Sequence, residues 1–385
     1  MSMPLDHYVS DEAFDPEATV APGSLPSERY LRASQTQIIW WRFLRHRLAV
    51  VSLVFLGASY FSILISELIA PYELQSRNSS FIYAPPQRIH LFHDGSFIGP
   101  FVYPLDFELN METLKREYTL DTSEPQRIRF LCSGEEYNFW DLFDGTFHFV
   151  CPPADGTLFL LGTDRLGRDM FSRLTYGARI SLTIGLVGVT LSYAIGIVVG
   201  GIAGYFGGIF DSIVQRLTEI LRSIPELPLW MALSAALPVT WDPRLIYFGI
   251  TVILALLDWP SIARAVRSKL FALREEDYVA AAEMMGAKPS RVIGRHLLPN
   301  FTSHLIASAS LTIPTMILAE TALSFLGLGL RPPITSWGVL LNEAQNIEAV
   351  ALYPWLLMPM VPVMLIVLAF SFLGDGLRDA IDPHD

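Results

Sequence analysis

The sequence is poor in cysteine and in charged residues. Its 385 residues include two cysteines, too few for a disulfide-rich scaffold or for a four-cysteine zinc site. Charged residues make up 17% of the chain, whereas soluble domains usually contain about 25%. The net charge of −11 argues against a nucleic-acid-binding protein, because phosphate contacts require clustered Lys and Arg. With 51% hydrophobic residues, the composition favours an integral membrane protein.

Three enzyme signatures are also absent. The sequence contains no G-x-x-x-x-G-K-[ST] phosphate loop, no H-E-x-x-H zinc motif and no G-x-S-x-G nucleophile elbow. We therefore expect no catalytic residues, no metal site and no ATPase activity in this chain. If it transports a solute, the energy comes from partner subunits or from ion coupling through buried carboxylates.

Long apolar stretches, in which Asp258 is the single charged residue, indicate how many helices cross the membrane. A bilayer core of about 30 Å requires roughly 20 apolar residues in a helix. We predict an all-α polytopic membrane protein with six transmembrane helices, the third and fourth of them short and interrupted. The six stretches are Leu48–Ser66, Ile180–Phe210, Leu227–Trp241, Leu245–Ala263, Phe301–Ala319 and Ala349–Leu373.

Basic residues predict the orientation. They cluster before the first stretch, from Arg29 to Arg47, and between the fourth and fifth, from Arg264 to Arg295. The positive-inside rule then places both clusters and both termini in the cytoplasm. One group of arginines conflicts with this assignment, because it would lie outside: Arg165, Arg168, Arg173 and Arg179.

The polar segments divide the chain further. Residues 1–28 carry six acidic residues and no basic one, which predicts a disordered acidic cytoplasmic tail. Residues 29–70 hold an N-terminal cytoplasmic segment and the first span. Residues 71–160 form an aromatic-rich insertion, which predicts a folded, strand-rich extracytoplasmic domain. Its two cysteines, Cys132 and Cys151, form a disulfide if the compartment is oxidising, and are buried thiols otherwise.

A ladder of small residues marks the second predicted span. On a helix, small residues spaced four apart form a ridge that allows another helix backbone to approach closely. Generic glycine content of a membrane helix is the alternative reading. The ladder consists of Gly188, Ser192, Gly196, Gly200 and Gly204.

The segment 264–300 predicts a helix–turn–helix at the membrane surface. Asp277 and the two acids before it suit a helix N-terminus, and Gly286 can end that helix with a positive φ. Pro289 suits the first turn of a second helix, and Pro299 would end it. The segment is either a docking element for a partner or an amphipathic interfacial loop.

This segment resembles the EAA loop of ABC-importer permeases, whose short helix sits in a groove on an ATPase subunit. The loop's name-giving glutamate is replaced by Ala280. The matching residues are Tyr278, Ala281, Ala282, Gly286, Ile293, Leu298, Pro299 and Asn300. Further blocks resemble the C-type permease subunit of the dipeptide/oligopeptide/nickel family. They are Leu161–Arg173, Gly177–Leu182, Gly204–Asp211, Glu320–Gly329, Ser336–Gly338 and Gly374–Pro383, which assign residues 161–385 to a permease core.

The resemblance implies the type I ABC-importer permease fold and a non-enzymatic, channel-forming subunit of the bacterial inner membrane. It implies a heterodimer with a second, paralogous permease subunit and two ABC ATPase subunits that carry ATP and Mg, while this chain carries no cofactor. An extracytoplasmic solute-binding protein would deliver an oligopeptide, with an oligosaccharide as the alternative. Rival classes are an ATP-independent secondary transporter and a purely structural membrane subunit.

Two sets of candidate residues follow. Glu226 and Glu320 are acids within or beside predicted spans, and they are candidates for the solute pathway or its gate. The resemblance implies that the ATPase docks on residues of the 264–300 loop. These residues are Tyr278, Ala281, Ala282, Glu283, Gly286, Ala287, Arg291 and Pro299.

Overall fold

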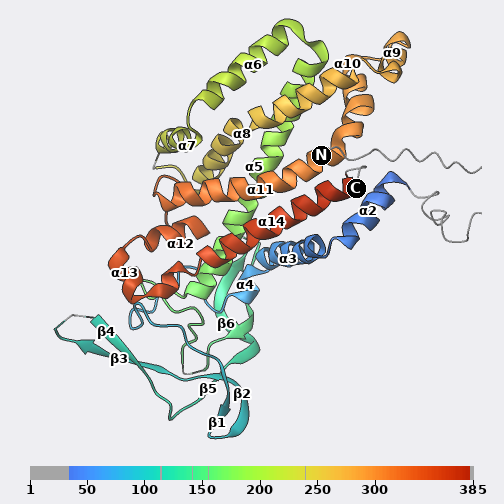
Figure 1. The fold of residues 1–385 in the computed structure, drawn as a ribbon. Helices are drawn as coiled ribbons and strands as arrows, with labels where there is room; N and C mark the ends of the chain where they lie inside the picture. The colour runs from blue at the N-terminus through green and yellow to red at the C-terminus, as the bar shows by residue number, and fades with distance from the viewer. Residues whose placement is uncertain (1–33, 113–114, 141, 155, 239, 382–385) are drawn as a thin grey trace, which may run out of the picture.

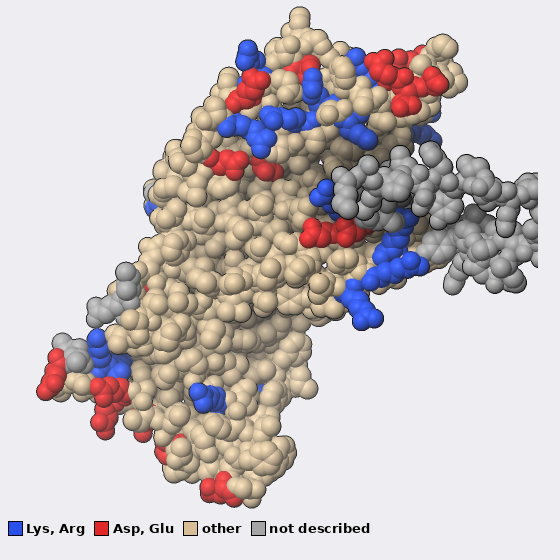
Figure 2. Space-filling view, viewed as in Figure 1, with Lys and Arg blue, Asp and Glu red and all other residues tan. Residues whose placement is uncertain are grey.

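The computed structural model describes residues 34–112, 115–140, 142–154, 156–238 and 240–381. The acidic tail predicted for residues 1–28 lies outside these ranges. Long helices form the body of the molecule, and the strands gather at one end of it (Figure 1). Figure 2 shows charged side chains near both ends of one face, with a broad uncharged band over the helices between them.

Five stretches of the described residues are helical, long and apolar enough to cross a bilayer. The first three are α3 (Arg47–Leu64), α5 (Met170–Phe206) and α8 (Pro243–Leu273). The fourth, Pro289–Phe325, ends in α11 (Thr302–Phe325). The fifth, Pro354–Ile381, contains a 3₁₀ turn (Pro354–Leu357) and α14 (Met360–Ile381).

The third predicted stretch differs from the others. It contains α7 (Glu226–Ala235), which has only ten residues. Before it lies α6 (Gly208–Ser223), and Pro225 separates the two because it lacks a backbone N–H donor. Together α6 and α7 lead the chain from the end of α5 to the start of α8 (Figure 1). The start predicted at Leu227 is one residue from the start of α7, but this helix ends at Ala235 rather than Trp241, and α6 was not predicted.

Short helices flank the spanning ones. At the start, α2 (Gln35–Arg45) has a capping box in which Ser34 and Gln37 bond each other's backbone N–H groups. A single turn, α4 (Ser66–Ile69), follows α3. Between α8 and α11 lie α9 (Asp277–Met284), α10 (Pro289–Arg291), a π turn (Val292–Leu297) and a 3₁₀ turn (Leu298–Phe301). Between α11 and α14 lie α12 (Trp337–Glu343) and α13 (Ile347–Leu352).

The described residues of the insertion contain seven strands in three antiparallel sheets, ordered β1-β2-β5, β3-β4 and β6-β7. Cys132 of β6 and Cys151 of β7 are joined by a disulfide bond. The strands are β1 (His90–His93), β2 (Ser96–Val102), β3 (Leu105–Asn110), β4 (Lys115–Leu120), β5 (Gln126–Arg127), β6 (Arg129–Phe139) and β7 (Phe143–Cys151).

The helical core is built around α5. Its buried side chains meet those of α8 and α11, among them Ile184, Leu254 and Met316. On its other side, Leu182 packs with α3 and α14 through Leu56 and Ile366. Residues of α5 therefore belong to both of these hydrophobic clusters.

Candidate functional site

The 264–300 loop forms a short helix that ends at a glycine. Gly286 has φ +80°, a conformation that residues with a Cβ rarely adopt, and its N–H donates to the Glu283 carbonyl at 2.8 Å. The N–H of Ala287 donates to the Ala282 carbonyl at 3.0 Å. These bonds satisfy carbonyls at the end of α9 and turn the chain sharply toward α10.

The two faces of α9 have different environments. Val279 and Ala282 are buried and pack against the body, where Val279 meets Val292 and Leu297. Ala282 therefore supports the loop from its inner face, and its predicted contact with an ATPase stays a prediction. The exposed residues of the candidate docking set are Tyr278, Ala281, Glu283, Gly286, Arg291 and Pro299, and Ala287 is half-buried. Beside them lies a groove of about 770 Å³, lined by Met285, Gly286, Lys288, Arg291 and His296 among others.

Side-chain bonds attach this loop to α5 and to the start of the next helix. The Tyr205 hydroxyl, near the end of α5, donates to Glu283 Oε1 at 2.6 Å. The Arg274 guanidinium donates to the Tyr205 carbonyl at 3.3 Å. Asn300 Nδ2 donates to the Tyr278 hydroxyl at 3.1 Å. The sequence analysis missed Tyr205 and Arg274, although Tyr205 lies in one of the family-like blocks.

Pro299 does not end the second helix, contrary to the prediction. The chain runs from α10 through the π turn and the 3₁₀ turn directly into α11. The wider π turn precedes the proline ring and removes the need for an α-helical hydrogen bond at that residue. The loop is thus continuous with a spanning helix on its C-terminal side.

The small-residue ladder of α5 faces α8. A Cβ added at Gly200 would clash with the backbone carbonyl oxygen of Ala263, and one at Gly196 would lie 2.7 Å from Ile262 Cβ. A Cβ at Gly204 would lie 2.7 Å from the Arg267 carbonyl oxygen. Ser192 donates to Asp258 at 3.0 Å, whereas Gly188 lies in ordinary contact distance of Met316. A Cβ added at Gly188 would also lie 3.9 Å from Thr251 Cγ2 of α8, so all five ladder positions lie against α8.

Replacing Gly200 by Leu is expected to lower the apparent melting temperature of the purified subunit, because the side chain would overlap the α8 backbone. Overpacking of this kind costs about 1–3 kcal/mol. Gly57→Leu on α3 is the matched control, since nothing lies within 4 Å of a Cβ added there. Equal melting temperatures for the two variants in detergent would contradict close α5–α8 packing.

The two candidate pathway acids are far from equivalent. Glu226 is exposed at the start of α7. Glu320 is completely buried in α11 and accepts hydrogen bonds from Ser324 and Ser336, both at 2.7 Å, and from Ser181 at 3.5 Å. The Glu320 carboxylate thus joins α5, α11 and the start of α12, and its predicted role in the solute pathway or its gate stays a prediction.

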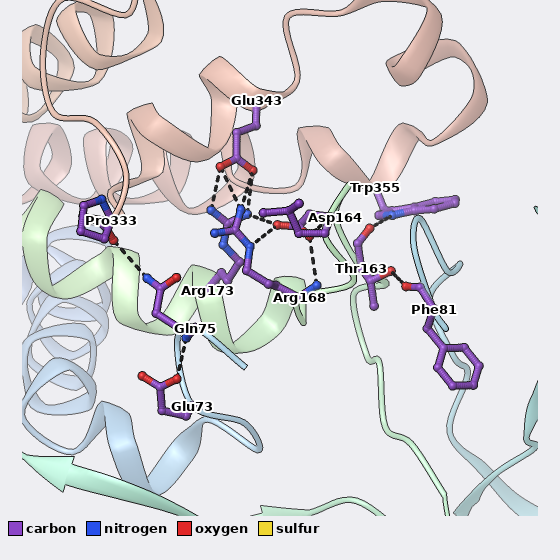
Figure 3. Close-up of polar contacts among 11 residues, drawn as sticks. Glu73, Gln75, Phe81, Thr163, Asp164, Arg168, Arg173, Pro333, Glu343 and Trp355 are labelled. Atoms are coloured by element: carbon purple, nitrogen blue, oxygen red, sulfur yellow. Dashed lines mark hydrogen bonds and ion pairs between the residues drawn. The ribbon is translucent and has the colours of Figure 1, made fainter. Parts of the chain in front are cut away.

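A buried cluster of four charges lies at the start of α5, which the sequence analysis did not recognise as a site (Figure 3). Arg173 Nη1 lies 2.6 Å from Asp164 Oδ2 and 2.7 Å from Glu343 Oε2. Arg168 Nε lies 2.7 Å from Asp164 Oδ2, and its Nη2 lies 3.2 Å from Glu343 Oε1. Two acids and two arginines thus balance, and they join the segment before α5 to α12.

The arginines of the cluster favour the ionised form of Glu343. Burial alone would raise the pKa of Glu343, but the hydrogen bond from Arg173 and the nearby arginine charges hold that pKa below its ordinary value. The same region is held by Trp355 Nε1, which donates to the Thr163 carbonyl at 3.0 Å, and by Gln75 Nε2, which donates to the Pro333 carbonyl at 3.2 Å (Figure 3). The cluster therefore joins α5 to α12, and the Gln75 bond joins the insertion to the segment before α12.

Comparisons with known proteins agree with this arrangement. The family described as binding-protein-dependent transport system inner membrane component matches residues 196–384. The family described as the N-terminal TM domain of oligopeptide transport permease C matches residues 34–86.

Individual relatives are similar to more than half of the chain. The dipeptide transport system permease protein DppC of Bacillus subtilis is 41% identical over 232 residues, which span 60% of this chain and 70% of DppC. The oligopeptide transport system permease protein OppC of the same organism is 38% identical over 233 residues, which span 60% of this chain and 73% of OppC. The glutathione transport system permease protein GsiD of Pectobacterium atrosepticum is 38% identical over 223 residues, which span 58% and 72% of the two chains. A solved structure of the inward-facing MetNI methionine ABC transporter aligns with a TM-score of 0.43 and 23% identity, covering 55% of this chain and 98% of that chain.

Proposed function

The chain belongs to the family of binding-protein-dependent transport system inner membrane components, and from this premise we propose that it forms half of the channel of a peptide importer. It is a permease subunit of an ABC importer. The observation that carries the peptide assignment is its 41% identity to a dipeptide permease. The named cargoes of the relatives above are dipeptide, oligopeptide and glutathione, which favours a peptide over an oligosaccharide.

The proposed topology has six crossings, the third made by α6 and α7 together. The α9 end of the molecule faces the cytoplasm, and the strands lie outside, with Lys and Arg around α2 and α9 as the main support. Three of the four arginines that conflict with this orientation have acidic partners. Arg168 and Arg173 pair with Asp164 and Glu343, and Arg179 Nη2 lies 2.5 Å from Glu67 Oε2. All four arginines also follow the long insertion, where the positive-inside rule carries little weight, so they do not argue against this orientation.

The coupling mechanism proposed here runs through α9. A partner ATPase would bind the exposed face around Tyr278 and Gly286, while ATP and Mg stay on that partner. Closure of the ATPase pair would displace α9, and the Tyr205–Glu283 bond would pass the displacement to α5. The ladder packs α5 closely on α8, so both helices would move together between inward- and outward-facing states. A second, paralogous permease would complete the channel, and a solute-binding protein would deliver the peptide.

Reconstitution of the complete importer tests this function. With its partner permease, both ATPases and the binding protein in proteoliposomes, uptake of a labelled oligopeptide is expected to require ATP. The isolated chain is expected to show no uptake under a proton or sodium gradient. Failure to co-purify with an ATPase, or gradient-driven uptake by the chain alone, would contradict the proposal.

A further inference from the structure

The β6–β7 hairpin places an apolar tip beside the end of a membrane-spanning helix. The hairpin tip is defined here by Phe139, Trp140, Leu142 and Phe143. Trp140 Nε1 donates to the carbonyl oxygen of Leu64 at 3.0 Å, and Leu64 is the last residue of α3. Because α3 is one of the five apolar helices, this bond sets the hairpin tip at the level where that helix ends.

Arg179 of α5 fixes Trp140 in this position. Its guanidinium carbon lies 4.0 Å from the centroid of the Trp140 ring, and its Nε donates to the Ile63 carbonyl at 3.2 Å. Its Nη2 pairs with Glu67 of α4 at 2.5 Å. The indole N–H thus has a hydrogen-bond acceptor, and the arginine charge has an acidic partner. Because both polar groups are paired, placing them in a weakly polar environment costs little.

The remaining side chains of the hairpin tip are exposed and apolar. Leu142 is 76% exposed and Phe143 is 58% exposed, and the Phe143 ring stacks on Phe139 with centroids 5.2 Å apart. On α3, Phe61 and Leu64 are also exposed, and they lie on a helix whose surface meets lipid. Trp140 joins the two apolar surfaces through its bond to Leu64.

From this arrangement we infer that the hairpin tip is a membrane anchor, which inserts Leu142 and Phe143 into the lipid leaflet in which α3 ends. Trp is the residue that membrane proteins favour at the headgroup level, where an apolar ring and a polar N–H are both accommodated. Continuity with the lipid-facing surface of α3 favours lipid over a protein partner as the occupant.

This anchor would attach the insertion to the bilayer through the tip of its disulfide-bonded hairpin. The attachment would not depend on the direction of transport. The inference requires only that α3 crosses the membrane. It goes beyond transport itself, because it assigns a lipid-binding role to a segment outside the regions matched by the two families.

The test uses a spin label at Leu142→Cys in the complete importer, reconstituted in phosphatidylethanolamine–phosphatidylglycerol vesicles. Met111→Cys is the matched control, since Met111 is 78% exposed and follows β3 in a hairpin that projects away from α3 (Figure 1). Both native cysteines are bonded to each other, so the unsubstituted chain should take up no label. Collisions with oxygen, which concentrates in lipid, are compared with collisions with a water-soluble nickel chelate.

The label at 142 is expected to collide at least several-fold more with oxygen than with nickel, and the label at 111 is expected to show the reverse preference. If the label at 142 collides more with the nickel chelate than with oxygen, as the label at 111 is expected to do, the anchor is overturned. Shielding of the 142 label from both reagents would also overturn it, in favour of a covering protein. Peptide uptake by both labelled importers is measured in parallel, so failure of the anchor is distinguishable from failure of the proposed function.

Discussion

Replacing Gly286 by Asp is expected to abolish ATP hydrolysis coupled to peptide transport while the subunit stays folded in the membrane. Nothing in the subunit lies within 4 Å of a Cβ added at Gly286, so the new side chain meets no part of this chain. It would instead occupy the surface on which the ATPase is proposed to dock. Loss of a central docking contact costs about 2 kcal/mol or more, which corresponds to roughly 30-fold weaker association.

The matched control for Gly286→Asp is Gly95→Asp in the β1–β2 turn. Gly95 has φ +77° and Gly286 has φ +80°, and both positions are open, so the backbone cost of the substitution is nearly the same. We expect coupled ATP hydrolysis to be unchanged for Gly95→Asp. The measurement is peptide-stimulated ATPase activity. If the Gly286→Asp importer hydrolyses ATP as fast as the unsubstituted importer, docking at this turn is contradicted.

The sequence predicted those helices whose apolar residues run without interruption. The regions of α3, α5, α8, α11 and α14 were found because they lack charged residues over most of a bilayer thickness. The path through α6 and α7 was missed because α6 carries Arg216, Glu219 and Arg222, which exclude it from any uncharged window. The role of α6 in this path becomes clear only when the positions of α5 and α8 are known.

The turn at Gly286 was predictable because a glycine after a short helix is a local signal for a positive φ. Which alanine of the run Ala280–Ala282 faces inward was not predictable, since three identical small residues carry no pattern. The position of Glu320 was also beyond the sequence. Its three serine partners come from α5, α11 and the start of α12, and only the tertiary fold brings them together.

Replacing Arg173 by Met is expected to destabilise the subunit strongly. The substitution leaves Glu343 with the longer contact to Arg168 and gives the buried cluster a net negative charge. Removing one partner of a buried ion pair costs about 3–5 kcal/mol. Arg216→Met is the control, because the Arg216–Glu219 pair is exposed and such pairs contribute only about 0–1 kcal/mol. Thermal unfolding of the purified subunit in detergent measures both effects.

The double variant Arg173→Met with Glu343→Met separates charge balance from packing. It leaves Asp164 with its partner Arg168 at 2.7 Å, so the remaining cluster is again neutral. The double variant should therefore be more stable than Arg173→Met alone, which yields a coupling energy between positions 173 and 343. If instead the loss of stability in the double variant equals the sum of the losses in the two single variants, the two side chains act independently. Their contacts would then not be the link that holds α12 on α5.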